Sequence, residues 1–415
     1  MAVKKGYKPT DVGVIPNDWQ VRSIQEISNP VRGGSPRPAG DPRFFEGTFI
    51  PWLTVAALTN IPSSQLKVSK TDSCLTEEGS LRSRILYPGT LILANSGATL
   101  GVAKILDIKC CANDGIAALL NFNPAISTTY LVHYINTRTQ YLRDVVATGN
   151  GQPNLNTELI GNFKVPFPPT LLEQNAIAGA LSDADAWIES LEQLIAKKRQ
   201  IKQGAMQELL TGKRRLPGFS GKWEKKRLGE IVDTDPENLG SDTRPDYAFN
   251  YISLEDVDTG TLRSYSEQVF QTAPSRARRR LRPNDVLVST VRPNLLSHLL
   301  FTNEGGNWVC STGFCVVRCG QGVTHPYFVF SQVFSDGVKR QIEALLTGSN
   351  YPAINSRDVR ALLIPIPNYD EQTAIANIRW DLDAEIAALE AKLAKAREVK
   401  QGMMQELLTG RIRLV

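Results

Sequence analysis

The residues with the clearest chemical potential are arginines clustered in the second half of the chain. Guanidinium groups at this density can neutralise several phosphates, and a single arginine can donate two hydrogen bonds to guanine O6 and N7. The segment therefore predicts contact with a polyanion, although a solvated basic edge would have the same composition. The arginines lie within seven positions just before a predicted strand: Arg276, Arg278, Arg279, Arg280 and Arg282.

Amide, hydroxyl and further arginine side chains stand on loops elsewhere in the chain. Amide side chains on exposed loops can read adenine edges, but the same residues are ordinary turn formers, so both interpretations stay open for each one. The segments concerned are VRGGSPRPAGDPR, ANSGATLG, TGNGQPN, RPN and TGSNYP. They supply the remaining candidate DNA contacts: Arg32, Arg37, Arg43, Asn95, Ser96, Thr99, Asn150, Gln152, Asn154, Arg292, Asn294, Asn350 and Tyr351.

Catalytic signatures are missing from the sequence. It has no GxxxxGK[ST] phosphate loop, no GxGxxG after a strand and no Asn-Pro-Pro-aromatic tetrapeptide. The cysteines at 310, 315 and 319 lack the paired spacing of a zinc site, and none of the three histidines has a Cys or His at ligand spacing. We therefore predict no catalytic residue and no metal on this chain. A metal-dependent nuclease is the alternative, with Asp246, Glu255, Asp256 and Asp258 as its conceivable ligands.

The composition predicts a cytoplasmic protein without a membrane-spanning segment. The 415 residues suffice for two or three domains, and the net charge of +5 is only a weak pointer to polyanions. No apolar run of about 18 residues is present, which predicts no membrane span. The first residues lack an apolar signal region, and the six cysteines show no disulfide framework.

An internal repeat organises these elements. KQGAMQELLTGKRRL at 202–216 returns as KQGMMQELLTGRIRL at 400–414, and LLEQNAIAGAL pairs with YDEQTAIANIR at the same offset of 198. Trp19 and Trp223 stand at matching places near the start of each copy. The middles of the copies diverge, which predicts two versions of one unit of about 200 residues.

Each copy ends in a predicted long helix. Thr170 with Glu173, and Asn368 with Glu371, have capping-box spacing, while Gly212 and Gly410 follow the last periodic leucines. Apolar residues recur every three or four positions between these ends, as in a coiled coil. Each helix should be about 60 Å long at 1.5 Å per residue. Connectivity makes the pair antiparallel. The carboxylates of Asp183, Asp185 and Glu189 are expected on a solvated face.

The segments before each helix read as mixed α/β domains. Predicted strands are FIPWLTVAAL, GTLILANSG, GVAKILDI and GIAALLNF in the first copy, and FNYISLEDV, NDVLVSTV, NWVCST and FCVVRC in the second. One helix is predicted over 127–148 and its counterpart over 325–346. The fold class is therefore α+β: two mixed α/β domains separated by two long antiparallel coiled-coil helices, as a tandem repeat with pseudo-two-fold symmetry.

YKPTDVGVIPNDW at 7–19, the doubled MQELLTG segments and the order of domains resemble the specificity subunit of type I restriction–modification systems. The resemblance covers essentially the whole chain. It implies target recognition domains at 1–169 and 216–367, each reading one half of a bipartite, gapped DNA site. It also implies long helices at 170–215 and 368–415 that set the gap and dock methyltransferase subunits.

The same resemblance implies partners that carry the chemistry. S-adenosylmethionine would bind the methyltransferase subunits, expected in two copies, while ATP and magnesium would serve partner subunits including the restriction subunit. This chain itself would be non-catalytic and hold no cofactor. A coiled-coil scaffold with protein-binding domains is the competing class of function. The predicted docking surface lies in the repeated segments: Gln203, Gly204, Met206, Gln207, Gln401, Gly402, Met404 and Gln405.

Overall fold

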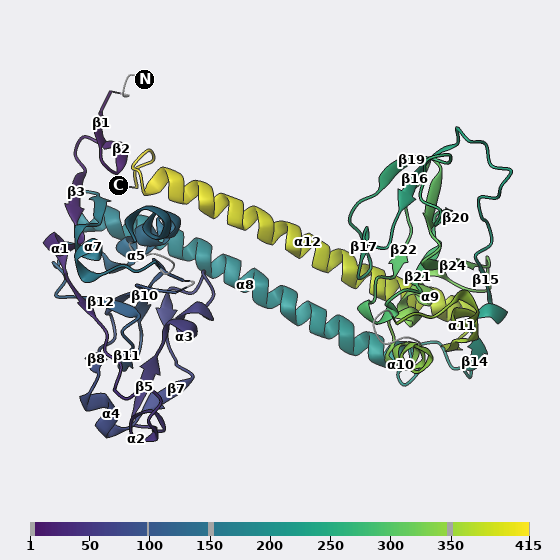
Figure 1. Cartoon of the computed structure of the whole chain (residues 1–415), viewed down its shortest axis with the longest axis horizontal. Helices are drawn as coiled ribbons and strands as arrows, with labels where there is room; N and C mark the ends of the chain where they lie inside the picture. The colour runs from purple at the N-terminus through teal and green to yellow at the C-terminus, as the bar shows by residue number, and fades with distance from the viewer. Residues whose placement is uncertain (1–4, 98, 148–152, 347–351, 415) are drawn as a thin grey trace. The chain divides into compact units, whose positions relative to one another are not determined.

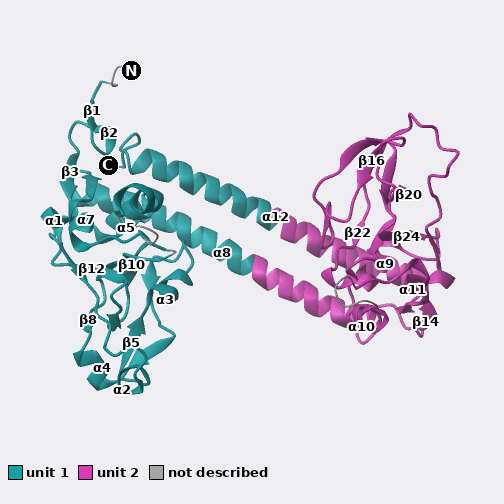
Figure 2. Cartoon of the chain, viewed as in Figure 1, with its two compact units in different colours: residues 1–194, 389–415 teal, residues 195–388 magenta. Residues whose placement is uncertain are grey.

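The computed structural model of the chain describes residues 5–97, 99–147, 153–346 and 352–414. They belong to two compact units, coloured separately in Figure 2. Unit 1 contains residues 1–194 and 389–415, and unit 2 contains residues 195–388. The candidate residues Asn150, Gln152, Asn350 and Tyr351 lie outside the described ranges.

Unit 1 contains two sheets, and strands β9, β10 and β11 in them are buried along their whole length. The five-stranded sheet has the order β4-β12-β9-β10-β6, and the four-stranded sheet has the order β7-β5-β11-β8. Two strand pairs, β1-β2 and β13-β3, complete the strands. The strands are β1 (Tyr7–Thr10), β2 (Gly13–Pro16), β3 (Gln20–Ser23), β4 (Asn29–Arg32), β5 (Ile50–Leu53), β6 (Lys67–Val68), β7 (Ser73–Leu75), β8 (Arg84–Leu86), β9 (Leu91–Ala94), β10 (Ala103–Leu106), β11 (Cys110–Ala112), β12 (Ile116–Leu120) and β13 (Lys164–Phe167).

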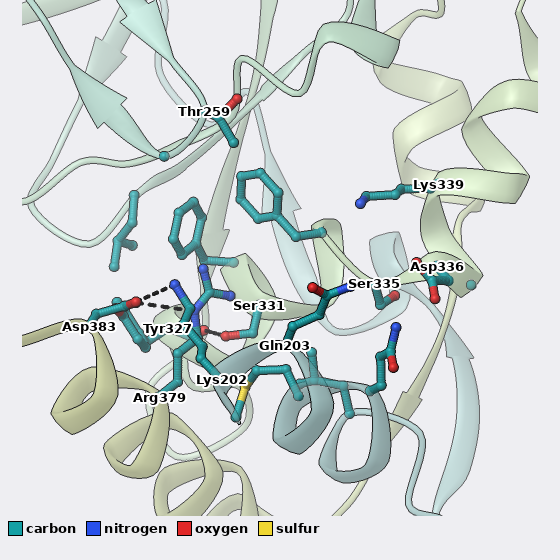
Figure 3. Close-up of a pocket in the computed structure, with 18 of the residues that line it drawn as sticks. Lys202, Gln203, Thr259, Tyr327, Ser331, Ser335, Asp336, Lys339, Arg379 and Asp383 are labelled. Atoms are coloured by element: carbon teal, nitrogen blue, oxygen red, sulfur yellow. Dashed lines mark hydrogen bonds and ion pairs between the residues drawn. The ribbon is translucent and has the colours of Figure 1, made fainter. Parts of the chain in front are cut away.

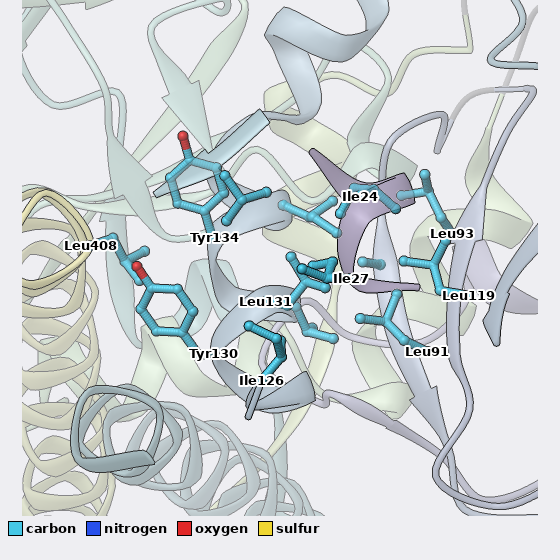
Figure 4. Packing of buried hydrophobic residues seen from close by; sticks show 14 of the residues in the cluster. Ile24, Ile27, Leu91, Leu93, Leu119, Ile126, Tyr130, Leu131, Tyr134 and Leu408 are labelled. Carbon is cyan, nitrogen blue, oxygen red and sulfur yellow. The ribbon is translucent and has the colours of Figure 1, made fainter. Parts of the chain in front are cut away.

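Short helices join these strands. They are α1 (Ile24–Ile27), α2 (Pro42–Phe45), α3 (Val55–Thr59), α4 (Glu77–Leu81), α5 (Thr128–Thr137), α6 (Thr139–Tyr141), the π-helical turn η1 (Leu142–Val146) and α7 (Thr157–Asn162). Figure 4 shows how Tyr130, Leu131 and Tyr134 of α5 pack with Leu91 and Leu93 of β9 in the largest apolar core of the unit. Burying side chains of this size is the main driving force for the fold.

Unit 2 repeats this plan with different residues. Its two four-stranded sheets have the orders β15-β24-β21-β22 and β19-β16-β23-β20, with additional pairs β14-β25 and β17-β18. The strands are β14 (Glu224–Arg227), β15 (Val232–Thr234), β16 (Ala248–Ile252), β17 (Val257–Asp258), β18 (Thr261–Leu262), β19 (Ser266–Val269), β20 (Ala277–Leu281), β21 (Val286–Ser289), β22 (Leu299–Leu300), β23 (Trp308–Ser311), β24 (Phe314–Cys319) and β25 (Leu363–Ile366). The helices are η2 (Leu228–Glu230), η3 (Pro293–Leu295), α9 (Pro326–Val333), α10 (Asp336–Leu345) and α11 (Ser356–Ala361).

The two long helices are α8 (Leu171–Leu209) and α12 (Tyr369–Leu407), each of 39 residues, as predicted. Each begins in one unit and ends in the other (Figure 1). In unit 1, Asp185 and Glu192 of α8 pair with Lys400 and Arg397 of α12. The partner numbers fall as the α8 numbers rise, so the helices are antiparallel, which confirms that prediction. In unit 2 the pairs Lys198–Glu385 and Lys202–Asp383 show the same direction.

The helix starts differ from the prediction in one respect. Thr170 Oγ1 accepts a hydrogen bond from Glu173 N at 3.2 Å, so it caps α8 as predicted. The Glu173 carboxylate, however, accepts two hydrogen bonds from the guanidinium of Arg413. Glu173 is almost fully buried, and an arginine fork satisfies a buried carboxylate better than one backbone N–H does.

The same joint is present in unit 2 at an offset of 198. Asn368 Oδ1 accepts from Glu371 N at 2.9 Å, and Arg215 donates to both oxygens of Glu371 at 2.7 and 2.6 Å. Gly212 and Gly410 both have positive φ, of 68° and 70°, as predicted for residues that end a helix. The repeat therefore encodes equivalent contacts.

Three local predictions were wrong. The segments 127–148 and 325–346 are each divided, because new helix starts such as Ser335, whose Oγ accepts from Val338 N, interrupt them. FIPWLTVAAL is strand only to Leu53 and then turns into α3, capped by Thr54. The central arginines precede strand β21, as predicted, and also form a strand of their own, β20. Asp185 is buried rather than solvated, since α12 covers it and supplies Lys400.

Candidate functional site

The loops of unit 1 that carry candidate residues meet at one sheet edge. Strand β12 lies between β4 and β9 and is antiparallel to both. The ends of β4 and β9 and the start of β12 must therefore lie at the same edge. Arg32 ends β4, Asn95 follows β9, and Asp114 precedes β12.

Hydrogen bonds tie these loops together at Asp114. Its carbonyl oxygen accepts from Arg32 Nε at 2.7 Å and from Asn95 Nδ2 at 3.2 Å. Its carboxylate accepts from Ser35 Oγ at 2.6 Å and from Arg37 Nη2 at 3.4 Å. The Ser35 hydrogen bond is the main cause that lowers the pKa of Asp114, so its side chain is charged at neutral pH.

Asn154, the last residue of the third predicted segment, lies at the same edge. Ser96 forms an isolated β-bridge with Asn154, and Leu155 N donates to Asn95 O at 2.8 Å. Thr99 shares a 3.1 Å hydrogen bond with Thr59 of α3. The Asn95 side chain is buried, so it supports the loops from beneath. Arg43 is placed elsewhere: it donates to Asp41 at the start of α2 and stacks over Phe44.

Unit 2 has the same frame at the corresponding edge. Strand β24 lies between β15 and β21 and is antiparallel to both. Ile354 N donates to Thr290 O at 2.9 Å, and Val291 bridges Ala353. Arg292 N donates to Pro352 O at 2.8 Å. Arg292, just before η3, and Asn294, within η3, therefore follow Val291 as the loop residues after Ser96 follow it in unit 1.

The arginine run divides into structural and outward members. Arg276 lies next to this edge, since its carbonyl oxygen accepts from Thr312 N at 2.8 Å. Arg278 stacks over Phe270 at 4.8 Å, and Arg282 pairs with Glu237 at 2.5 Å. Arg280 is exposed.

Arg279 is largely buried and bonds to other residues of unit 2. Its guanidinium pairs with Asp235 and also bonds Phe314 O and Ser356 Oγ, and only 14% of its side chain is exposed. Strand alternation turns Arg279 inward toward Asp235. The run therefore supplies fewer outward cations than its composition predicts.

Arg279→Ala should consequently lower stability, whereas Arg280→Ala should change DNA binding. Arg279→Ala leaves the half-buried Asp235 without its cation, so the midpoint of urea unfolding should fall to a lower urea concentration. Arg280→Ala should leave that midpoint unchanged and, with Arg276→Ala, flatten the salt dependence of DNA binding by about one phosphate contact each. An unchanged salt slope in the double variant would remove these arginines from the interface.

The groups considered for metal chemistry have separate partners. Asp246 pairs with Arg244, Asp258 pairs with Arg263, and Asp256 accepts from Ser253 and Ser264. Within the described ranges no three His, Cys, Asp or Glu side chains are arranged to hold a metal ion. Burial raises the pKa of Cys315 and of Cys319 to about 12, so both are thiols at neutral pH. No helix among the described residues is both long enough and apolar enough to cross a bilayer.

The repeated helix segments present a polar face with a glycine in it. Gln203, Gln207, Gln401 and Gln405 are exposed. Gly204 and Gly402 are exposed helix-interior residues, and a Cβ at either one would meet no atom within 4 Å. Packing within the described chain therefore does not require glycine there. The methionines differ: Met206 belongs to an apolar core, and Met404 is half-buried.

A pocket of about 1030 Å³ in unit 2 opens beside the first of these segments. Figure 3 shows Lys202 and Gln203 of α8, Tyr327 of α9, and Arg379 and Asp383 of α12 around it. Tyr327 Oη donates to Asp383 at 2.7 Å, and Lys202 pairs with the same carboxylate. Phe330, Phe334 and Trp380 add apolar surface, and further cations line the pocket: Arg199, Lys213, Lys339 and Arg340.

His298, whose ring packs against Phe334, should make the stability of unit 2 sensitive to acid. Burial and nearby Lys339 lower its pKa from 6.5 to about 4, and its Nδ1 accepts from Ser289 N at 3.0 Å. Between about pH 4 and 6.5, His298 is therefore protonated in the unfolded chain and neutral in the folded unit. The free energy of unfolding should fall as pH decreases from about 6.5 to about 4. His298→Asn keeps an acceptor but cannot be protonated, so urea unfolding should lose this part of its pH slope. If His298→Asn keeps the full pH dependence of the unfolding free energy, another group causes the acid sensitivity.

Comparison with known proteins agrees with this arrangement. The family model described as "Type I restriction modification DNA specificity domain" matches residues 16–203 and 220–398. The MjaVIII type I restriction enzyme specificity subunit of Methanocaldococcus jannaschii is 24% identical over 96% of this chain and 94% of its own. The putative MjaX specificity subunit of the same organism is 23% identical over 99% and 97%.

Solved structures show the same fold. The crystal structure of a type I restriction–modification S subunit from M. genitalium has a TM-score of 0.60 at 14% identity and covers 98% of both chains. A chain from a study of assembly of the type I restriction–modification system has a TM-score of 0.55 at 17% identity and covers 96% of this chain and 99% of its own.

The chain belongs to the type I restriction modification DNA specificity family and carries two copies of its domain. It is a specificity subunit of a type I restriction–modification system, which confirms the resemblance and the α+β fold class. Sequence analysis missed Ser35, Asp114, Asp235 and Ser356 as residues that organise the loops. Asp114 had one local signal, a turn-forming Asn-Asp-Gly directly before a strand.

Proposed function

We propose that each unit reads one half of a bipartite, gapped DNA site through the loops at its sheet edge. One observation carries the proposal: the backbone contacts that hold these loops are the same in both units, while the side chains differ. Asn95, Ser96 and Asp114 stand in one frame, and Thr290, Val291 and Thr312 stand in the other. Equal frames with unequal side chains suit two half-sites of different sequence.

The long helices would fix the gap and seat methyltransferase subunits. The repeated segment occurs once in each unit, so one chain could seat two copies of the same partner. In unit 2, Gln203, Met206 and Gln207 also line the pocket, whose apolar floor and cationic rim offer a side-chain anchor for that partner. Restriction subunits would complete the assembly. S-adenosylmethionine, ATP and magnesium would then act on partner subunits, and the assembly would work in the cytoplasm.

Methylation mapping tests this proposal directly. The chain would be co-expressed with its candidate methyltransferase subunit in a host that lacks DNA methylation, and methylated adenines would be mapped across the genome. We expect a split motif with a fixed gap. A stable complex that methylates nothing, although the catalytic site of the partner is intact, would instead support a scaffold with protein-binding domains.

A further inference from the structure

Asp114 accepts hydrogen bonds from four side chains of the loops of unit 1. Its main-chain oxygen holds Arg32 and Asn95, and its carboxylate holds Ser35 and Arg37. The contacts come from the loops after β4 and β9, which are far apart in sequence. The side chain remains 44% exposed, at the same edge as the candidate DNA contacts.

The repeat shows that the loop frame does not depend on this carboxylate. Thr312 occupies the corresponding place in unit 2, at an offset of 198. One glycine separates it from β24, as one glycine separates Asp114 from β12. The frame around it is nonetheless the same. Asn95 N donates to Gly115 O at 3.0 Å, and Thr290 N donates to Gly313 O at 2.8 Å. A carboxylate at 114 is therefore a particular feature of unit 1.

We propose that Asp114 is a positioning residue that holds Arg37 for sequence-specific contact with DNA. The proposal rests on DNA reading by unit 1, because it concerns the same loops. A carboxylate among arginines repels phosphate, so it lowers general attraction to the backbone. It also limits the directions in which the Arg37 guanidinium can donate. Because the pair is exposed and weak, a base edge can compete for the same donors.

The position of Arg37 agrees with this role. Its side chain is 72% exposed, so Asp114 restrains a guanidinium that otherwise faces solvent. Arg32 is restrained independently, through the main chain of the same residue, and Arg84 Nε donates to Arg32 O at 2.8 Å. Removing the carboxylate should therefore free Arg37 and leave the Arg32 contact in place.

Asp114→Asn should raise affinity for unrelated DNA and lower discrimination between DNA sequences. Loss of a negative charge should raise affinity for unrelated DNA about two- to threefold at low salt. Loss of the restraint on Arg37 should reduce discrimination by about tenfold, and only at one half of the split motif. Asp107→Asn is the matched control, since Asp107 is an exposed carboxylate of unit 1 that pairs with Lys67 at 3.3 Å. Asp107 follows β10 at the opposite end of β9 from Asn95, so this variant should raise general affinity less and leave discrimination unchanged.

The experiment uses the complete chain assembled with its methyltransferase subunit, and reads both the genomic methylation motif and affinity for unrelated duplex. The wild-type complex must first give a split motif; if it does not, the proposed function fails before this inference is tested. Relaxation of one half-motif by Asp114→Asn, and equally by Asp114→Thr, which copies the residue of unit 2, supports the inference. A full split motif in both variants overturns it.

A double-mutant cycle separates positioning from general structure. Arg37→Ala should relax the same half-motif, and adding Asp114→Asn to it should reduce discrimination no further, because the carboxylate then has no guanidinium to hold. Independent, additive losses would show that Asp114 does not act through Arg37, which would also overturn the inference.

Discussion

Lys400→Ala should lower the free energy of unfolding of unit 1 by about 3 kcal/mol, since removing one member of a buried ion pair costs about 3–5 kcal/mol. Lys400 Nζ lies 2.5 Å from Asp185 Oδ1, and the two side chains are 17% and 5% exposed. Asp185 Oδ2 already has no hydrogen-bond partner among the described residues. We choose the lower end of the range because buried Lys104 also attracts Asp185. Urea unfolding of the complete chain measures the change.

The repeat supplies the matched control. Lys202 and Asp383 form the corresponding pair in unit 2, where both side chains are 30% exposed beside the pocket. Asp383 also accepts from Tyr327, so Lys202→Ala leaves it partly satisfied. The expected loss is about 1 kcal/mol, because water screens a more exposed pair. Equal losses in the two variants would mean that burial does not set the strength of these pairs.

The Lys400→Ala penalty should also depend on pH. Burial raises the pKa of Asp185 above 3.8 even with Lys400 present, so the folded unit holds a proton on Asp185 more readily than the unfolded chain does. Lys400 lowers this pKa, so its removal should raise the pKa of Asp185 further. The penalty is therefore full above the pKa of Asp185 in the variant and decreases as pH falls from there toward the pKa that Asp185 has beside Lys400. The other ionisable groups that act on Asp185 are Lys104, His133 and Glu189. A penalty that stays constant down to pH 4 would contradict this cause.

Gly204→Ala with Gly402→Ala should weaken assembly with methyltransferase subunits while it stabilises the isolated chain. Each alanine should add up to about 1 kcal/mol, because glycine is the weaker helix former and the added Cβ meets no atom of the described residues within 4 Å. A partner packed closely on these helices would instead collide with the added methyl groups. We expect a loss of affinity of about tenfold or more, since overpacking typically costs 1–3 kcal/mol. Titration calorimetry of the complete chain with the partner measures it.

Gly179→Ala is the control for helix propensity. Gly179 is an exposed interior residue of α8, and its added Cβ also meets no described atom within 4 Å, but it lies outside segment 202–216 and corresponds to Asn377 in the other copy. It should stabilise the chain to a similar extent and leave assembly unaffected. If the Gly204 and Gly402 variants assemble normally, the partner does not approach the helices at these glycines.

Features that depend on local sequence were predictable. The repeat at an offset of 198, the caps at Thr170 and Asn368, the ends at Gly212 and Gly410 and the antiparallel direction of the helices all follow from the amino-acid sequence alone. Each depends on residues within a few turns of a helix or on chain connectivity, so periodicity and capping chemistry suffice. Direct contact of the predicted residues with DNA and with partner subunits stays a prediction.

The tertiary structure decided which of those residues meet and which are buried. Asp114 joins Arg37 to Asn95 only because β12 lies between β4 and β9, and strand order cannot be read from local patterns. Arg279 is withdrawn from the surface because β20 turns it toward Asp235, and Asp185 is buried because α12 covers it. These outcomes depend on contacts between residues far apart in sequence. The doubled unit and its resemblance to specificity subunits could be read from the amino-acid sequence, whereas packing fixed which side chains remain exposed.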